Sequence, residues 1–459
     1  MSAVSTAVPG FQGTLIGPDD SDYDEARTVY NAMIDRRPAL IGKATGPGDV
    51  TKLIGFARDH DLVIAVRGGG HNGAGLGTVD DGVVIDLSSL KNIQVDPDAR
   101  IVRVGGGCVW REVDGATGQH GFATPSGIIG TTGVGGLTLG GGLGHLSRKY
   151  GLTIDNLLEA EVVLASGDVV RASADENPDL FWAIRGGGGN FGVVTEFTFR
   201  LNEVGATIIG GPTFWPIEQT AEVLSVYRDF LPAAPRELNG FFAVASVPPG
   251  PPFPEELHLR KVCGVVWCYV GSEEDAAKAM KPLLDATPEP LLHGVQPMPH
   301  AMLQGAFDAL YPAGHQWYWR ADFVKEIPDE ALDIHARFGA EMPTIQSTMH
   351  LYPIDGAPHD IGDEDTAWSY REANWATVYA GVDPDPANVD KIRSWSVGYF
   401  EALHPYSAGG AYVNMMMDEG QERVRAAYRG NYDRLARIKA QYDPDNTFRV
   451  NQNIQPKAA

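Results

Sequence analysis

The spacing of apolar and polar residues changes character near residue 205. From about residue 60 to that point, short runs rich in valine and isoleucine are separated by clusters of glycine. Beyond it, segments with apolar residues at helical spacing alternate with strand-like segments. The helical segments are 218–231, 273–284 and 389–404, and the strand-like ones are 239–247, 262–271 and 346–354. This alternation predicts an α+β second domain.

The end of the chain has a pattern of its own. Residues 419–444 carry apolar and aromatic residues at helical spacing, and the pattern stops at Pro444. The whole chain has 459 residues, which is roughly two or three domains of about 150 residues each. A large buried core is therefore available.

The stretch VIAVRGGGHNGAG, residues 63–75, places His71 in a loop otherwise nearly free of side chains. It contains GxGxxG at Gly68, Gly70 and Gly73. A dinucleotide fingerprint needs a strand before this motif and a helix straight after it. Here a second strand, VVIDLSSL, follows instead. The glycines then either offer backbone N–H groups to an anion or simply form tight turns between strands.

A second glycine-rich stretch, residues 125–151, holds more glycine than turns require. It lies about 60 residues after the first, so the two loops could hold one large phosphate-bearing cofactor between them. No GKS or GKT follows either loop, which excludes a Walker-type nucleotide site at the level of sequence motifs.

Charge and hydropathy exclude several classes of partner. The chain has 36 basic and 59 acidic residues, a net charge of −23, which disfavours binding to nucleic acid. No run approaches the roughly 20 apolar residues of a membrane span. The N-terminus has no basic region followed by an apolar block, so we expect a cytoplasmic protein without membrane contact.

The three cysteines fit neither a disulfide framework nor a paired zinc motif. Cys263 and Cys268 lie an odd number of residues apart in one strand-like segment, so their side chains should point to opposite faces. We expect both to be buried as apolar residues. No metal site is expected.

Seven motifs in the same order along nearly the whole chain resemble those of one enzyme family. The chain resembles the flavin-binding oxidoreductases of the vanillyl-alcohol oxidase and p-cresol methylhydroxylase (PCMH) superfamily. It is most similar to the berberine-bridge-enzyme-like branch and, within it, to the bacterial 6-hydroxy-D-nicotine oxidase type. The motifs are RRPALIGKATGPGDV, VRGGGHNGAG, the second glycine-rich stretch, KYGLTIDNL, LFWAIRGGGGNFGVV, TAWSYREANW and YDPDNTFRVNQNIQP.

The resemblance implies an α+β fold in three parts. A PCMH-type FAD-binding domain of two subdomains is expected over residues 1–205. A substrate domain over 206–410 would have an antiparallel sheet backed by helices, and residues 411–459 would return to the first domain. FAD would then lie at the junction.

His71 is implied as the point where FAD is covalently attached, through the 8α-methyl carbon of the flavin. Such a bond should raise the reduction potential and prevent loss of the cofactor. Alternatively, His71 is only a hydrogen-bonding residue beside a noncovalent flavin. Many relatives add a second bond from a cysteine, but that position is Ile129 here, so a single bond is expected. The predicted cofactor-binding residues are Arg67, Gly68, Gly69, Gly70, His71, Asn72, Gly75, Thr131, Thr132, Gly135, Gly136, Gly141, Gly142, Val194, Tyr412, Asn451 and Asn453.

The resemblance implies an oxidase that removes a hydride from a carbon bearing oxygen or nitrogen. The substrate would be a small secondary metabolite, an alkaloid-like compound or a sugar, and the protein a monomer or small homo-oligomer. Thr132 aligns with an oxygen-gate position at which valine accompanies oxygen access. Threonine has nearly the shape of valine but adds a hydroxyl, so a dehydrogenase with another electron acceptor is the alternative. A flavin-binding protein without turnover is a second alternative.

Two residues are candidates for proton transfer. Tyr412 falls in a Tyr-x-Asn arrangement that resembles the active-site strand of relatives, where a tyrosine acts as or assists the base. With an ordinary pKa near 10 it would need a neighbour that lowers that value; otherwise it packs over the flavin. His350 has an ordinary pKa suited to proton transfer, or it is a structural histidine in a strand.

The remaining candidates concern the substrate wall and the chain end. Trp317 and Trp319 share one face of a probable strand, as do His350 and Tyr352. We predict that Trp317, Trp319 and Tyr352 bind substrate, although the tryptophans could equally form domain core. Asn451 and Asn453 would touch the flavin unless they belong to a surface tail. The TAWSYREANW motif, with Arg371 and Trp375, is expected to be structural.

Overall fold

Two sheets built by the first 200 residues support the glycine-rich loops. The computed structural model describes residues 7–457. The first sheet has the order β1-β2-β4-β3; β2, β4 and β3 are parallel, and β1 is antiparallel to β2. Its elements are β1 (Thr14–Ile16), α1 (Tyr23–Ala26), β2 (Leu40–Lys43), α2 (Pro47–Asp59), β3 (Ile64–Arg67) and β4 (Val83–Asp86). The short apolar runs form the parallel strands, which are almost entirely buried, as parallel sheets require.

The second sheet is antiparallel and has the order β5-β6-β10-β8-β9. Strand β10 runs through its centre and carries Phe197 and Phe199 into the core. The strands are β5 (Ile93–Asp96), β6 (Ile101–Gly105), β8 (Leu157–Val163), β9 (Val169–Ser173) and β10 (Val193–Arg200). Helices α3 (Trp110–Gly118) and α6 (Pro178–Ile184) add to the same core, and β7 (Phe122–Ala123) pairs with β11 (Asn202–Glu203).

An eight-stranded antiparallel sheet forms the second half of the molecule. Along it the strands follow the order β15-β12-β14-β13-β18-β19-β17, and β16 pairs with β12. The strands are β12 (Ile208–Pro216), β13 (Leu238–Ser246), β14 (Lys261–Tyr269), β15 (Leu292–His293), β16 (Gln296–Met298), β17 (Gln316–Val324), β18 (Thr348–Pro353) and β19 (Trp375–Asp383).

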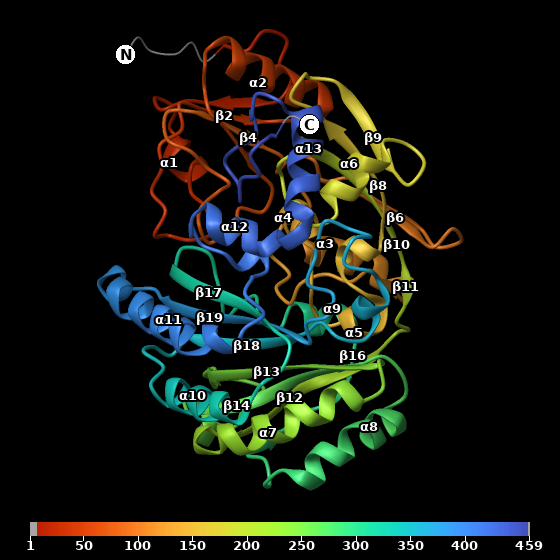
Figure 1. Cartoon of the computed structure of the whole chain (residues 1–459), viewed down its shortest axis with the longest axis vertical. Coiled ribbons are helices and arrows are strands. Elements are labelled where there is room, and N and C mark those ends of the chain that lie inside the picture. The colour runs from red at the N-terminus through yellow and green to blue at the C-terminus, as the bar shows by residue number, and fades with distance from the viewer. Residues whose placement is uncertain (1–6, 458–459) are drawn as a thin grey trace.

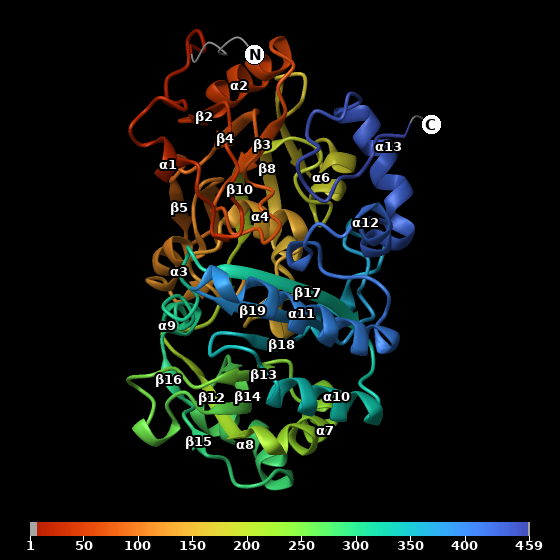
Figure 2. The ribbon, with the colours of Figure 1, turned by 90° about the vertical axis from the view of Figure 1, so that its left-hand side faces the viewer.

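Helices cover one face of this sheet, and the other face points toward the first domain (Figures 1 and 2). Cys263 and Cys268 of β14 are both buried and belong to the cores on opposite faces, which confirms the expected alternation. The covering helices are α7 (Thr220–Phe230), α8 (Glu273–Ala286), α10 (Asp329–Ala340) and α11 (Val389–Leu403); α9 (His300–Gln304) contacts α3 and β12. The α+β fold class, with an antiparallel sheet backed by helices, is confirmed.

The end of the chain differs from the single helical pattern expected for residues 419–444. Two helices form, α12 (Gln421–Tyr428) and α13 (Tyr432–Tyr442), separated by a short turn in which Arg429 has φ +45°. Tyr428 and Tyr432 are both buried, so the apolar spacing continues across the break. Helix α13 packs against α6 and thereby joins the end of the chain to the first domain (Figure 2).

The second glycine-rich stretch is partly helical, which the sequence did not indicate. Helix α4 (Val134–Gly140) and a short turn of helix, α5 (Ser147–Tyr150), lie within it. A Cβ on Gly140 would lie 2.3 Å from the side chain of Asn414. Glycine therefore lets this helix approach the C-terminal segment closely, despite the low helix propensity of glycine.

Candidate functional site

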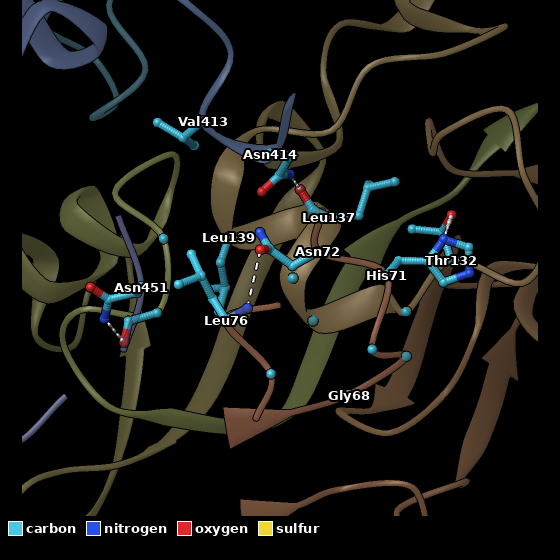
Figure 3. A pocket seen from close by; sticks show the side chains of 18 of the residues that line it. Gly68, His71, Asn72, Leu76, Thr132, Leu137, Leu139, Val413, Asn414 and Asn451 are labelled. Carbon is cyan, nitrogen blue, oxygen red and sulfur yellow. Dashed lines mark hydrogen bonds between the residues drawn. The ribbon is translucent and has the colours of Figure 1, made fainter. Parts of the chain in front are cut away.

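A cavity of about 350 Å³ lies where the first domain meets the large sheet. Its lining comes from β3 and the loop after it, from the second glycine-rich stretch, from the loop 188–192 and from the terminal segment 448–452. The large sheet closes it with side chains of β17, β18 and β19. Residues from all three predicted parts of the chain therefore meet here, and Figure 3 shows the side toward the first domain.

The two glycine-rich loops cross in direct contact. A Cβ on Gly69 would lie 2.4 Å from the backbone nitrogen of Gly133, and a Cβ on Gly133 would lie 2.3 Å from that of Gly69. Real Cβ atoms do not approach backbone so closely. Gly70 has φ +68°, which favours glycine. The glycines thus serve the crossing itself, beyond any tight turns, and expose backbone at the cavity wall.

His71 stands at this crossing (Figure 3). Its ring stacks on Tyr30, with centroids 3.9 Å apart and planes inclined by 21°. Nε2 lies 3.0 Å from Oγ1 of Thr131, and Nδ1 lies 3.4 Å from Oγ1 of Thr132. Burial lowers the pKa of His71 to about 4. The imidazole is therefore neutral at neutral pH and keeps one nitrogen lone pair, which is the form that can bond to an electron-poor carbon.

The other predicted residues of the first domain divide into two groups. One group lines the cavity: Arg67, Gly68, Gly69, Gly70, Asn72, Thr132, Gly135, Gly136 and Val194. Arg67 forms a buried ion pair with Asp86, with Nη2 2.7 Å from Oδ2. Asn72 accepts a hydrogen bond from the backbone N–H of Leu76 (3.2 Å), so its side chain shapes its own loop.

The second group lies behind the lining: Gly75, Thr131, Gly141 and Gly142 do not face the cavity. Gly75 (φ +71°) packs on Ile34, and Gly141 (φ +133°) packs on Trp368. At these positive φ angles glycine is favoured, so both residues allow turns of the backbone behind the cavity wall. Thr131 contacts His71, which lines the cavity. The backbone N–H of Gly142 donates to Tyr412, which also lines it.

Tyr412 lines the cavity from a loop, not from the strand that the sequence comparison suggested. It directly precedes a 3₁₀ turn (Val413–Met415). Its Oη accepts hydrogen bonds from the backbone N–H of Gly142 (2.8 Å) and from Nδ2 of Asn414 (2.7 Å). Burial raises the pKa of Tyr412 to about 12, although both donors act to lower it. Tyr412 is therefore a phenol at neutral pH, with both lone pairs occupied and its own proton available to donate.

The terminal segment contributes Asn451 but not Asn453 to the lining. Nδ2 of Asn451 donates to the carbonyl oxygens of Phe448 (2.9 Å) and Gly189 (3.2 Å). Lys439, fully buried, donates to the carbonyl oxygens of Asn190 and Phe448 as well as to Asp443. This lysine fixes the loop 188–192 and the terminal segment together, so residues 448–452 are not a surface tail.

The large sheet supplies an aromatic wall. His350 and Tyr352 share one face of β18, as predicted, and Nδ1 of His350 lies 2.6 Å from Oη of Tyr352. Burial lowers the pKa of His350 to about 3. The expectation that its pKa suits proton transfer at neutral pH is therefore wrong, because its apolar surroundings disfavour the charged form.

Trp317 and Trp319 of β17 also line the cavity. Their rings are 5.9 Å apart and inclined by 69°, so they are not parallel plates that could hold a ring between them. Trp317 packs against Tyr30 and Tyr311. A Cβ on Gly73 would lie 2.3 Å from the ring of Trp319. The first glycine loop thus packs directly on the substrate-side sheet.

Several residues in or directly behind the lining were not predicted from the sequence. Tyr30 stacks on His71 from a position 41 residues earlier, in a segment without a motif. Asn414 was visible only as the partner in the Tyr-x-Asn arrangement, Gln452 only as a member of the terminal motif, and no sequence signal indicated Tyr311. Only the glycine cluster of the loop 188–192 could have been recognised in advance.

Residues 7–457 contain no group of three or more histidine, cysteine or acidic side chains placed to hold a metal ion. No helix among them has the length and hydropathy to cross a membrane. Cys108 lies outside the cavity, and burial raises its pKa to about 11. Ile129, at the position of a second flavin link in relatives, faces the cavity.

Comparisons with known proteins agree with this geometry. The FAD binding domain family matches residues 38–173, and the berberine and berberine-like family matches residues 411–455. An FAD-linked oxidoreductase of Dictyostelium discoideum is 31% identical over 97% of this chain and 95% of its own. The crystal structure of 6-hydroxy-D-nicotine oxidase from Arthrobacter nicotinovorans matches with a TM-score of 0.85 at 27% identity, over 97% of this chain and 98% of that one.

A glucooligosaccharide oxidase from Acremonium strictum, described as carrying 6-S-cysteinyl, 8α-N1-histidyl FAD, has the same fold (TM-score 0.85, 23% identity, 97% of this chain and 98% of that one). Two family matches and a relative similar over the whole length agree with the resemblance found in the sequence. The chain therefore belongs to the FAD-linked oxidoreductases, in the berberine-bridge-enzyme-like branch.

Proposed function

We propose that this oxidoreductase is an oxidase that acts on a C–O or C–N bond of a small molecule, with FAD held by a single covalent bond from His71 and oxygen as the electron acceptor. The observation that carries the proposal is the placement of His71. A neutral imidazole stands in the cavity at the crossing of two glycine loops, with both ring nitrogens beside threonine hydroxyls.

The residues of the cavity suit FAD. The glycines of both loops leave backbone free to approach an extended, phosphate-bearing molecule, and Oδ1 of Asn451 is a buried acceptor without a partner within residues 7–457. Ile129 offers no thiol, so a second bond cannot form at that position. When bound, FAD accepts a hydride and passes electrons on to an acceptor.

The side chains of the cavity are suited to positioning the substrate, because none of them is a base that would remove a proton from it at neutral pH. No aspartate, glutamate or lysine lines the cavity within residues 7–457, and His350 is held neutral. We infer that Tyr412 acts as a hydrogen-bond donor, because its lone pairs are occupied and its pKa is raised to about 12. A substrate alcohol or amine would thus be oriented by the Tyr412 O–H and by the aromatic wall.

Thr132 supports oxygen as the acceptor. Its hydroxyl lies 3.4 Å from Nδ1 of His71, so its polar group is directed to the histidine. The methyl group that remains for the cavity resembles that of valine in shape and polarity. Rapid reoxidation of substrate-reduced flavin in air supports the oxidase. Slow reoxidation in air with fast electron transfer to a dye would identify a dehydrogenase.

The attachment of FAD is tested by denaturing the purified protein with acid. We expect the yellow colour to precipitate with the wild type and with the control His120→Ala, which changes an exposed histidine. The flavin should remain in the supernatant for His71→Ala. Release of flavin from the acid-denatured wild type would refute the covalent bond and leave a noncovalent flavoprotein.

A further inference from the structure

The substrate side of the cavity is aromatic and carries no charge. Arg67 is the one charged side chain that lines the cavity among residues 7–457, and it is already paired with Asp86 at the end toward the first domain. Strands β17, β18 and β19 and the segment directly before β17 present only uncharged groups to the cavity. They are Tyr311, Trp317, Trp319, Thr348, His350, Tyr352, Val378 and Ala380.

Such a wall disfavours an ionised substrate. A charge moved from water to this cavity would lose hydration and meet no opposite charge, which is far costlier than burying a neutral group. A neutral aromatic molecule loses little hydration and gains contact with the rings. Within this lining, selectivity must therefore come from shape and from hydrogen bonds.

His350 is the polar group best placed to supply such a hydrogen bond. Its Nδ1 is paired with Oη of Tyr352, while Nε2 has no partner in the described part of the chain. Four aromatic rings flank the imidazole, with centroids of Phe241 at 5.0 Å, Tyr352 at 5.4 Å, Phe307 at 6.2 Å and Tyr311 at 6.5 Å. The ring is fixed on one edge and offers its other nitrogen to a ligand.

The pairing also decides which nitrogen carries the proton. Nδ1 of His350 is the one hydrogen-bond partner of the Tyr352 hydroxyl within residues 7–457. Either direction leaves one proton of the pair free, but the phenol O–H, with an ordinary pKa near 10, is a stronger donor than the N–H of a neutral imidazole, and the imidazole nitrogen is the stronger acceptor. Tyr352 therefore donates to Nδ1, and the proton of the neutral imidazole lies on Nε2.

We propose that His350 is a specificity-determining residue: its Nε2–H binds an acceptor atom, such as a carbonyl oxygen or ring nitrogen, of an uncharged, flat aromatic substrate. Tyr352 is a positioning residue that fixes the proton on Nε2. This inference rests on the proposed function for the identity of the site, but its test measures binding without turnover.

The first test compares three planar probes of nearly equal shape. Benzamide is neutral, benzamidine is a cation and benzoate is an anion. Their binding to the flavin-loaded protein is followed by the change in the visible flavin spectrum. We expect benzamide to bind at least tenfold more tightly than either charged probe. Equal or tighter binding of benzamidine or benzoate would overturn the assignment of an uncharged substrate.

The second test isolates the hydrogen bond. Acetophenone and α-methylstyrene differ by a carbonyl oxygen in place of a methylene group. We expect the ratio of their dissociation constants to change by about tenfold in His350→Leu relative to the wild type. The variant lacks the Nε2–H that donates to the carbonyl oxygen of acetophenone, so acetophenone loses its advantage over α-methylstyrene. The same ratio in His120→Leu, which makes the matched change at an exposed histidine outside the cavity, should not change.

Tyr352→Phe leaves His350 in place but removes the hydroxyl that fixes its proton on Nε2, so the imidazole proton can then occupy either nitrogen. We expect the probe ratio to move toward that of His350→Leu, and the ¹⁵N NMR signals of His350 to lose the pattern of a proton held on Nε2. An unchanged ratio in both variants, or a wild-type spectrum with the proton on Nδ1, would overturn the role of His350. If the probes behave as expected but no compound is oxidised, the proposed function fails while this inference stands.

Discussion

Removing the hydroxyl of Tyr412 should destabilise the protein, whereas the same change at Tyr428 should not. Oη of Tyr412 is the acceptor for the buried N–H of Gly142 and for one N–H of Asn414. In Tyr412→Phe, the amide of Asn414 keeps its bond to the carbonyl oxygen of Leu137 (3.0 Å). The Gly142 N–H loses its partner.

The size of the effect follows from the cost of a buried polar group left without a hydrogen bond. One such group costs about 1–3 kcal/mol. Tyr428 is buried as well and lines the same cavity, but its hydroxyl has no hydrogen-bond partner within residues 7–457, so Tyr428→Phe leaves no protein group unpaired and should be neutral or slightly stabilising. The free energies of unfolding of the two variants should therefore differ by about 1–3 kcal/mol.

Two measurements on the flavin-loaded protein check this difference. Urea unfolding gives the midpoints, which are compared only if the slopes agree. Hydrogen exchange of peptides that cover residues 137–146 reports the local effect, because 1.4 kcal/mol corresponds to about a tenfold change in an opening equilibrium. Equal midpoints for the two variants, with unchanged exchange in this segment, would refute the assigned hydrogen bond.

The remaining predictions concern the crossing of the loops, the buried ion pairs and acid stability. Gly69→Ala should cost more than about 1–3 kcal/mol in stability, because the new Cβ meets the backbone of Gly133 and no flexible side chain can move aside; an unchanged thermal midpoint would contradict this. Arg371→Gln should cost about 3–5 kcal/mol, because it leaves the carboxylate of Asp155 buried without its partner. The exposed Arg236→Gln should cost at most about 1 kcal/mol, and similar urea midpoints for the two arginine variants would argue against the difference. Stability should fall as the pH drops from about 6.5 to 5, by up to about 1.4 kcal/mol per pH unit for each buried histidine, because the unfolded chain binds protons that the folded chain excludes. A constant urea midpoint over that range would contradict the lowered pKa values of His145, His300, His335 and His350.

The sequence predicted those elements in which hydrophobic period and residue propensity agree. Strands β13, β14 and β18 and helices α7, α8 and α11 match the expected segments to within two residues at each end. Helix α4 was missed because its glycines lower helix propensity, and only its contact with Asn414 shows why they are there. The break between α12 and α13 was missed because Tyr428 and Tyr432 keep helical spacing across a turn at Arg429.

Sequence motifs identified those parts of the site that are built from residues close together in the chain. They did not identify contacts between residues that only the fold brings together. The loop around His71 could be recognised from its own residues, and so could the paired faces of β17 and β18. Tyr30 against His71, Gly69 against Gly133 and Lys439 against the terminal segment each join distant positions. No local pattern encodes such contacts.

The protonation states of the site residues could not be predicted from the sequence either, because they depend on the surroundings that the fold creates. Reference pKa values suggested His350 as a proton acceptor and Tyr412 as a base in need of activation. The fold holds both neutral over the physiological range, because four aromatic rings surround the histidine and burial outweighs the two hydrogen bonds that the tyrosine accepts. We infer that both residues act as hydrogen-bond donors. If this inference holds, such a cavity would orient a neutral substrate and leave the change of charge in the reaction to the bound cofactor.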